Sequence, residues 1–260
     1  MTFTRGSGTE LFDSDGRRYL DFLCGLAVTS LGHSHPRIAA AISDQSGKLL
    51  HTSNLFATEP QLEVARRIDT LVRSGIGQPG RVLFQNSGAE TIEAAVKLAR
   101  KYHGPGRHGM VSAYRSFHGR TLAALAATGQ PEKHEPFQPL PEGFRLASWN
   151  DTEAFATAVD PTVGAILVEP LQGEGGVNPP NPGVLQGLRD LCDERGLLLI
   201  IDEVQMFKYE IESLGRTFDP QSIAVARSVN IVDSSKEYEE AIANRVMARR
   251  RTQELSLIHI

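Results

Sequence analysis

The chain has 260 residues, of which 40% are hydrophobic and 22% are charged, and its formal net charge is −4 at pH 7. These values are ordinary for a globular protein and allow one large domain, alone or with a small second domain. The acidic balance argues against a surface for nucleic acid or anionic membranes, and no apolar run approaches the ~20 residues of a membrane span. The two cysteines, Cys24 and Cys192, provide neither a disulfide framework nor a metal-binding cluster, so we expect a reducing, cytoplasmic setting.

The N-terminal part of the sequence predicts a hairpin followed by two helices. Residues 9–22 contain two apolar-rich runs around a Ser-Asp-Gly segment, and Asp-Gly favours a tight turn between strands. Apolar residues then recur at helical spacing over residues 37–50 and again over residues 60–73. In the loop between hairpin and helix, His33 and His35 lack a third ligand at metal spacing, so no metal site is predicted.

The middle of the chain alternates between strands and helices. Short apolar runs predict strands at residues 81–84, 110–114, 165–169 and 197–201. Helical periodicity between and after them predicts helices at residues 91–103, 121–129 and 184–196. Such alternation is typical of an α/β fold with a parallel sheet covered by helices on both faces. From residue 206 the pattern weakens, and residues 234–255 predict one long polar helix.

Polar or glycine-rich segments follow all four predicted strands. They read QNSGAE, RSFHGRT, EPLQGEGG and DEVQ in chain order. In open parallel sheets, ligands bind beyond the carboxyl ends of the strands. One such segment is ordinary, but four together predict a site assembled from loops.

Two of these segments carry groups suited to anions and planar ligands. Ser87, Gly88 and Ala89 open a predicted helix, where backbone N–H groups and small side chains favour a phosphate; the alternative is an ordinary serine N-cap. Arg120 is a preferred partner for a carboxylate, and the nearby Phe117 ring could cover a planar ligand. The alternative there is a core phenylalanine beside a surface arginine.

Acidic residues complete the set of candidates. Glu169 and Glu174 lie in the glycine-rich segment EPLQGEGG, where an acid could pair with an arginine or fix a substrate; the alternative is a solvated loop acid. Asp202 follows five apolar residues, which places its carboxylate at the buried end of a strand. A buried carboxylate needs a partner, and a protonated heterocyclic nitrogen would serve. The alternative is an aspartate that caps the next helix.

Together, four segments resemble the class III aminotransferases of the ornithine/acetylornithine type. They are residues 84–100, 116–130, 166–177 and 198–205, and the resemblance extends over about residues 4–205. It implies a pyridoxal-phosphate enzyme of the aspartate-aminotransferase fold (fold type I) with a mostly parallel central sheet. Residues 1–45 would carry the hairpin and belong to a small domain, residues 46–205 would be part of the cofactor-binding large domain, and residues 206–260 do not resemble the family.

The resemblance also implies a role for each candidate residue at the cofactor. Residues 87–89 would hold the cofactor phosphate. Phe117 would stack on the pyridine ring, with His118 beside it. Asp202 would pair with the pyridine nitrogen, and Gln205 would lie near the 3-oxygen of the ring.

The implied reaction is an amino transfer with two small-molecule substrates. N-terminal segments look closest to the acetylornithine branch, so N-acetylornithine would give its δ-amino group to the cofactor and 2-oxoglutarate would receive it, as in arginine biosynthesis. Arg120 would bind the substrate α-carboxylate, and Glu174 would gate an active-site arginine. Relatives are homodimers. Ornithine or 4-aminobutyrate transamination, or non-catalytic cofactor binding, are the alternatives.

The sequence departs from the family pattern after Gln205. The family needs a lysine that forms a Schiff base with the cofactor, one strand and a loop further along. This chain has six lysines, and only Lys236 lies at about that distance, within a charged helical segment that indicates a surface position. We therefore expect a truncated form that lacks this lysine and is inactive as a transaminase.

Overall fold

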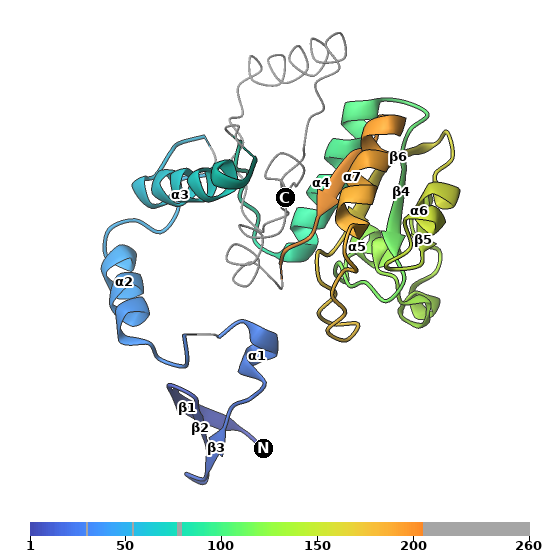
Figure 1. Ribbon diagram of the computed structural model, residues 1–260. Helices are drawn as coiled ribbons and strands as arrows, with labels where there is room; N and C mark the ends of the chain where they lie inside the picture. The colour runs from blue at the N-terminus through green and yellow to red at the C-terminus, as the bar shows by residue number, and fades with distance from the viewer. Residues whose placement is uncertain (30, 54, 77–79, 205–260) are drawn as a thin grey trace. The chain divides into compact units, whose positions relative to one another are not determined.

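The computed structural model describes residues 1–29, 31–53, 55–76 and 80–204 (Figure 1). The contacts divide the chain into a first unit, Met1–Phe56, and a second unit that begins at Ala57. The helix predicted over residues 234–255 lies outside the described residues. Within them, no helix is both long and apolar enough to cross a membrane.

The first unit contains a small antiparallel sheet. Its strands are β1 (Phe3–Ser7), β2 (Glu10–Asp13) and β3 (Arg18–Leu20), in that order across the sheet. The hairpin predicted over residues 9–22 is confirmed as β2 and β3, and Gly16 takes the positive φ of 81° that the turn requires. Asp13 organises the turn, because its Oδ1 atom accepts hydrogen bonds from the N–H groups of Asp15 and Arg17. β1 was not predicted, since it is held to β2 by backbone pairing and has little apolar patterning.

Two helices follow the sheet in this unit. They are the short α1 (Cys24–Ala27) and α2 (Pro36–Ser46). α2 confirms the helix predicted over residues 37–50 but ends at Ser46, where Gly47 caps it. In the segment between α1 and α2, the Nε2 atom of His33 lies 2.7 Å from the Oδ2 atom of Asp21, which follows β3.

The second unit is an α/β structure built on a four-stranded parallel sheet. Its strands are β4 (Gly109–Ala113), β5 (Phe144–Ala147), β6 (Val163–Val168) and β7 (Leu198–Ile201), in the order β5-β4-β6-β7. Its helices are α3 (Glu59–Ile76), α4 (Gly88–His103), α5 (Leu122–Ala127), α6 (Thr152–Ala158) and α7 (Val184–Arg195). All three strand pairs are parallel, which confirms the predicted fold class.

Helices cover both faces of this sheet (Figure 1). Successive strand residues point to opposite faces, so Ile166 packs with α6 and α7 while Leu167 packs with α4 and α5. The strands are therefore apolar on both faces and read as continuous hydrophobic runs, as expected of a buried parallel sheet. α5 is attached to α4 by Glu93, whose Oε1 atom accepts hydrogen bonds from the N–H groups of Ala123 and Ala124.

The structure differs from the sequence-based expectation at three places in the second unit. The strand predicted over residues 81–84 is wrong, because only Leu83 makes an isolated bridge and no ladder continues from it. β5 and α6 were not predicted. β5 is an edge strand of four residues that is mostly half-buried, so it lacks the long apolar run that marks β6 and β7.

Candidate functional site

Three loops leave the sheet at the carboxyl ends of β4, β6 and β7. Because these strands are parallel neighbours, their carboxyl ends lie along one edge of the sheet. Phe117, His118 and Arg120 follow β4, Glu169 and Glu174 follow β6, and Asp202 follows β7 directly. The structure thus collects side chains from the sequence-predicted loops at a single edge.

Asp202 and His118 form a buried pair at this edge. The Asp202 carboxyl is buried, as predicted, and its Oδ2 atom lies 2.7 Å from the Nδ1 atom of His118. Since a carboxylate oxygen only accepts, the proton in this contact belongs to Nδ1. The Asp202 Oδ1 atom accepts a second hydrogen bond from the Val204 N–H group at 3.1 Å. The Nε2 atom of His118 is also buried, and it has no hydrogen-bond partner within the described ranges.

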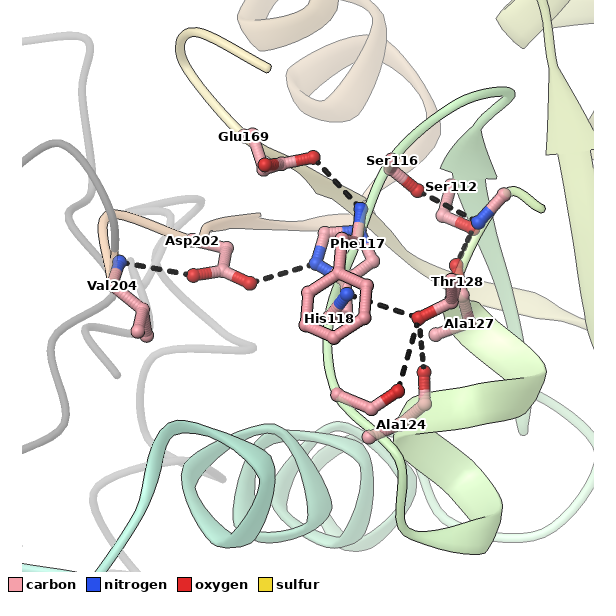
Figure 2. A network of polar contacts seen from close by, with 12 residues as sticks. Ser112, Ser116, Phe117, His118, Ala124, Ala127, Thr128, Glu169, Asp202 and Val204 are labelled. Atoms are coloured by element: carbon pink, nitrogen blue, oxygen red, sulfur yellow. Dashed lines mark hydrogen bonds and ion pairs between the residues drawn. The ribbon is translucent and has the colours of Figure 1, made fainter. Parts of the chain in front are cut away.

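Thr128, at the end of α5, fixes the loop that carries His118. The His118 N–H group donates to the Thr128 Oγ1 atom at 3.0 Å, so Asp202 and Thr128 hold the residue from two sides (Figure 2). Next to it, the Gly129 N–H group donates to the Ser116 Oγ atom at 3.0 Å. Sequence patterns did not identify Thr128, because its contact with His118 exists only after α5 has folded back onto the loop.

Glu169 connects the β6 loop to the β4 loop. Its Oε2 atom accepts a hydrogen bond from the Phe117 N–H group at 3.0 Å (Figure 2). Its Oε1 atom accepts one from the Gly173 N–H group at 3.4 Å. Burial raises the pKa of the Glu169 carboxyl to about 7; attraction from His118 opposes this rise, and repulsion from Asp202 adds to it. The sequence offers Glu169, like Glu174, as an acid that could pair with an arginine or fix a substrate, whereas in the structure it accepts a hydrogen bond from the backbone of Phe117.

The raised pKa of Glu169 makes stability depend on pH. Between about pH 4.5 and about 7 the folded protein keeps a proton that the unfolded chain has released. The free energy of unfolding should therefore fall as pH rises through this window, by about 3 kcal/mol from this group. Glu169→Gln should remove that slope in urea titrations, whereas Glu153→Gln, at an exposed position in α6, should retain it. Equal slopes in wild type and Glu169→Gln would contradict the assignment.

The start of α4 lies beside the end of β7. Ser87 is the N-cap of α4, and its Oγ atom accepts a hydrogen bond from the Glu90 N–H group at 3.2 Å. The N–H groups of Gly88 and Ala89 belong to the first helical turn and have no intrahelical acceptor. A Cβ atom on Gly88 would lie 3.0 Å from a Val204 methyl carbon, so the helix start lies against Val204, whose N–H group donates to Asp202.

Arg120 and Lys133 both lie near the Phe117 ring, and Lys133 also binds Glu174. The Arg120 guanidinium carbon lies 5.6 Å from the centre of the Phe117 ring. Both oxygens of Glu174 are engaged, one by Lys133 Nζ at 2.6 Å and the other by Gln130 Nε2 at 2.7 Å. Burial raises the pKa of Glu174, but the contacts with Lys133 and Gln130 outweigh it, so the pKa lies below its usual value. Lys133 and Gln130 were not foreseen, because no sequence spacing relates them to Glu174.

Gln205, expected near the ring oxygen of the cofactor, lies outside the described residues. The roles of the other candidate residues remain predictions, although the structure places them at one edge of one sheet.

Known proteins resemble both the sequence and the fold. A sequence model of the class III aminotransferases matches residues 1–206. Acetylornithine aminotransferase of Methanocaldococcus jannaschii is 45% identical over 209 residues, covering 79% of this chain and 51% of the relative. The chain therefore spans about half the length of this relative.

Solved structures give the same result. Ornithine aminotransferase of Toxoplasma gondii has 35% sequence identity and a TM-score of 0.71, over 79% of this chain and 49% of its own. An amine transaminase from an uncultivated Pseudomonas species, solved in its pyridoxal-phosphate-bound form, has 29% identity and a TM-score of 0.70, over 79% and 52% of the two chains. The family match, the sequence identity and the structural similarity agree, and this chain belongs to the class III aminotransferases.

Proposed function

We propose that this chain carries the pyridoxal-phosphate site of an aminotransferase of the acetylornithine type. One observation carries the proposal: the buried carboxylate of Asp202 lies at the end of β7 and accepts from the N–H group of Val204, whose side chain lies against Gly88 in the first turn of α4. A carboxylate and a helix N-terminus at one sheet edge match a ligand with a protonated ring nitrogen and a phosphate. The class III family membership supports this cofactor.

The residues present fit both ends of this cofactor. The N–H groups of Gly88 and Ala89, which lack intrahelical acceptors, would bind the phosphate together with the Ser87 hydroxyl. Asp202 uses two of about four acceptor positions, for His118 and Val204, which leaves capacity for a protonated ring nitrogen. Phe117, held at its backbone by Glu169, would lie against the ring.

The protein residues would control charge and orientation in the reaction. When bound, the cofactor supplies an electron-withdrawing ring that favours loss of a proton from the amino donor. Asp202 would keep the ring nitrogen protonated, and His118 would hold the Asp202 carboxylate in one orientation through its Nδ1–H. Arg120 would bind the substrate carboxylate through bidentate hydrogen bonds.

The substrates of the proposed function follow from the relatives. N-acetylornithine would be the amino donor and 2-oxoglutarate the acceptor, because acetylornithine aminotransferases are among the relatives with 43–48% identity. Ornithine is the rival donor, since a Toxoplasma gondii ornithine aminotransferase shares the fold. The same resemblance extends the proposal to arginine biosynthesis, a homodimer and a cytoplasmic location.

A covalent bond to the cofactor would require a lysine of this chain. Lys97 and Lys101 lie within α4, Lys48 follows α2, and Lys133 lies in a 3₁₀ turn (Pro131–Lys133) and is paired with Glu174. Lys208 and Lys236 lie outside the described residues. We therefore include in the proposal that this chain binds the cofactor without a covalent bond and does not itself complete transamination.

Two measurements on the full chain test the proposal. Pyridoxamine phosphate, whose amine forms no covalent bond with a lysine, should bind saturably in calorimetry and should be displaced by inorganic phosphate. Borohydride reduction in the presence of pyridoxal phosphate should label no lysine stoichiometrically. A folded chain that does not bind pyridoxamine phosphate would refute the cofactor site. A stoichiometric adduct at Lys236 together with turnover of acetylornithine would refute non-covalent binding.

A further inference from the structure

Lys133 and Gln130 occupy both oxygens of Glu174, as described above. The side chain of Lys133 is only 19% exposed, whereas that of Glu174 is 41% exposed. A lysine ammonium group that is mostly desolvated is stabilised more strongly by a carboxylate partner than a solvent-exposed lysine is. The Lys133–Glu174 pair is therefore an organised contact between the turn after α5 and the loop after β6.

A second cation lies within reach of the same carboxylate. The Lys133 Nζ atom lies 5.1 Å from the centre of the Phe117 ring, and the Arg120 guanidinium carbon lies 5.6 Å from it. Arg120 also attracts Glu174 through space and contributes to its lowered pKa. Arg120 is nevertheless exposed, and it forms no ion pair within the described part of the chain. Two cations thus approach one carboxylate, and Lys133 is the one that binds it.

The backbone around Glu174 is held in place independently of this pair. The Arg115 Nη2 atom donates to the Gly175 carbonyl oxygen at 2.8 Å. A Cβ atom on Gly175 would lie 2.1 Å from the Arg115 carbonyl oxygen, so the two loops are in direct backbone contact. A change of partner by Glu174 would therefore be a rotation of its side chain, with the loop itself staying in place.

We infer that Lys133 is a positioning residue that holds Glu174 and thereby keeps Arg120 unpaired for a carboxylate ligand. The inference rests on the proposed function only in taking Arg120 as the anion-binding group. Without Lys133, the Glu174 side chain would rotate toward the Arg120 guanidinium. A guanidinium is a better carboxylate partner than an ammonium group because it is planar and can donate two hydrogen bonds in a bidentate arrangement. The ligand class that benefits is a small molecule with a free carboxylate.

Binding of glutarate, a dicarboxylate without a reactive carbonyl, separates the positioning role from direct contact. Calorimetry with and without pyridoxamine phosphate should show that Lys133→Gln weakens glutarate binding by about fivefold, the effect of one partly exposed ion pair. The double variant Lys133→Gln/Glu174→Gln should recover wild-type affinity to within about twofold, because no carboxylate then competes for Arg120. Lys97→Gln, at an exposed position of α4, should match wild type.

Three results would overturn the inference. A double variant as weak as Lys133→Gln would mean that Lys133 contacts the ligand itself. An unchanged affinity in Lys133→Gln would mean that the pair does not control Arg120. A wild-type chain that binds pyridoxamine phosphate but not glutarate would refute the anion site while leaving the proposed cofactor site intact.

Discussion

Replacing Gly129 with alanine should prevent the second unit from folding stably. A Cβ atom at this position would lie 1.9 Å from the carbonyl oxygen of Ala113 and 2.8 Å from the Tyr114 Cα atom. Both are backbone atoms, so no side-chain rotation relieves the overlap. The clash would also separate Gly129 from Ser116 and Arg115, whose backbone groups exchange hydrogen bonds with it. We expect a loss of at least about 4 kcal/mol, measured as a shifted or absent urea transition followed by circular dichroism.

Gly183→Ala is the matched control for this substitution. Gly183 has a φ of 86°, and nothing lies within 4 Å of a Cβ atom built on it. Backbone strain alone should therefore cost about 1 kcal/mol. If Gly129→Ala were as stable as Gly183→Ala, the close contact between residue 129 and the end of β4 would be wrong.

Replacing Asp202 with alanine should impair both stability and cofactor binding. The substitution leaves the buried Nδ1–H of His118 without its acceptor and removes the acceptor of the Val204 N–H group. Breaking a buried, hydrogen-bonded pair by removing one partner costs about 3–5 kcal/mol. Loss of the charge that would face the protonated ring nitrogen should weaken pyridoxamine phosphate binding by at least about thirtyfold. Urea denaturation and calorimetry measure the two effects.

Asp202→Asn separates these two contributions. The asparagine side chain has nearly the same shape and keeps one oxygen that can accept from His118, so stability should fall by only about 1 kcal/mol. Its lack of charge should still weaken pyridoxamine phosphate binding strongly. Wild-type affinity in Asp202→Asn would show that Asp202 serves the fold and does not pair with the cofactor nitrogen.

Much of the fold was predictable because the signals are local. The hairpin of β2 and β3 follows from a turn sequence, and β6 and β7 follow from continuous apolar runs between glycines and polar residues. The buried position of Asp202 was predictable for the same reason, since it directly follows such a run. The strand expected at residues 81–84 failed because its apolar run is short, and only Leu83 within it forms a bridge.

The sequence by itself determined the α/β alternation, the loops that carry the site and, through its motifs, the family. Only the tertiary structure decided which groups in those loops bind one another. Asp202 pairs with His118 across 84 positions of sequence, Glu169 with Phe117 across 52, and Glu174 with Lys133 across 41. No periodicity relates residues so far apart, because their contacts arise from the parallel strand order β4-β6-β7 and the return of α5 onto the β4 loop. The electrostatics of the site therefore come from the packing of the sheet edge, although each of its loops is marked in the sequence.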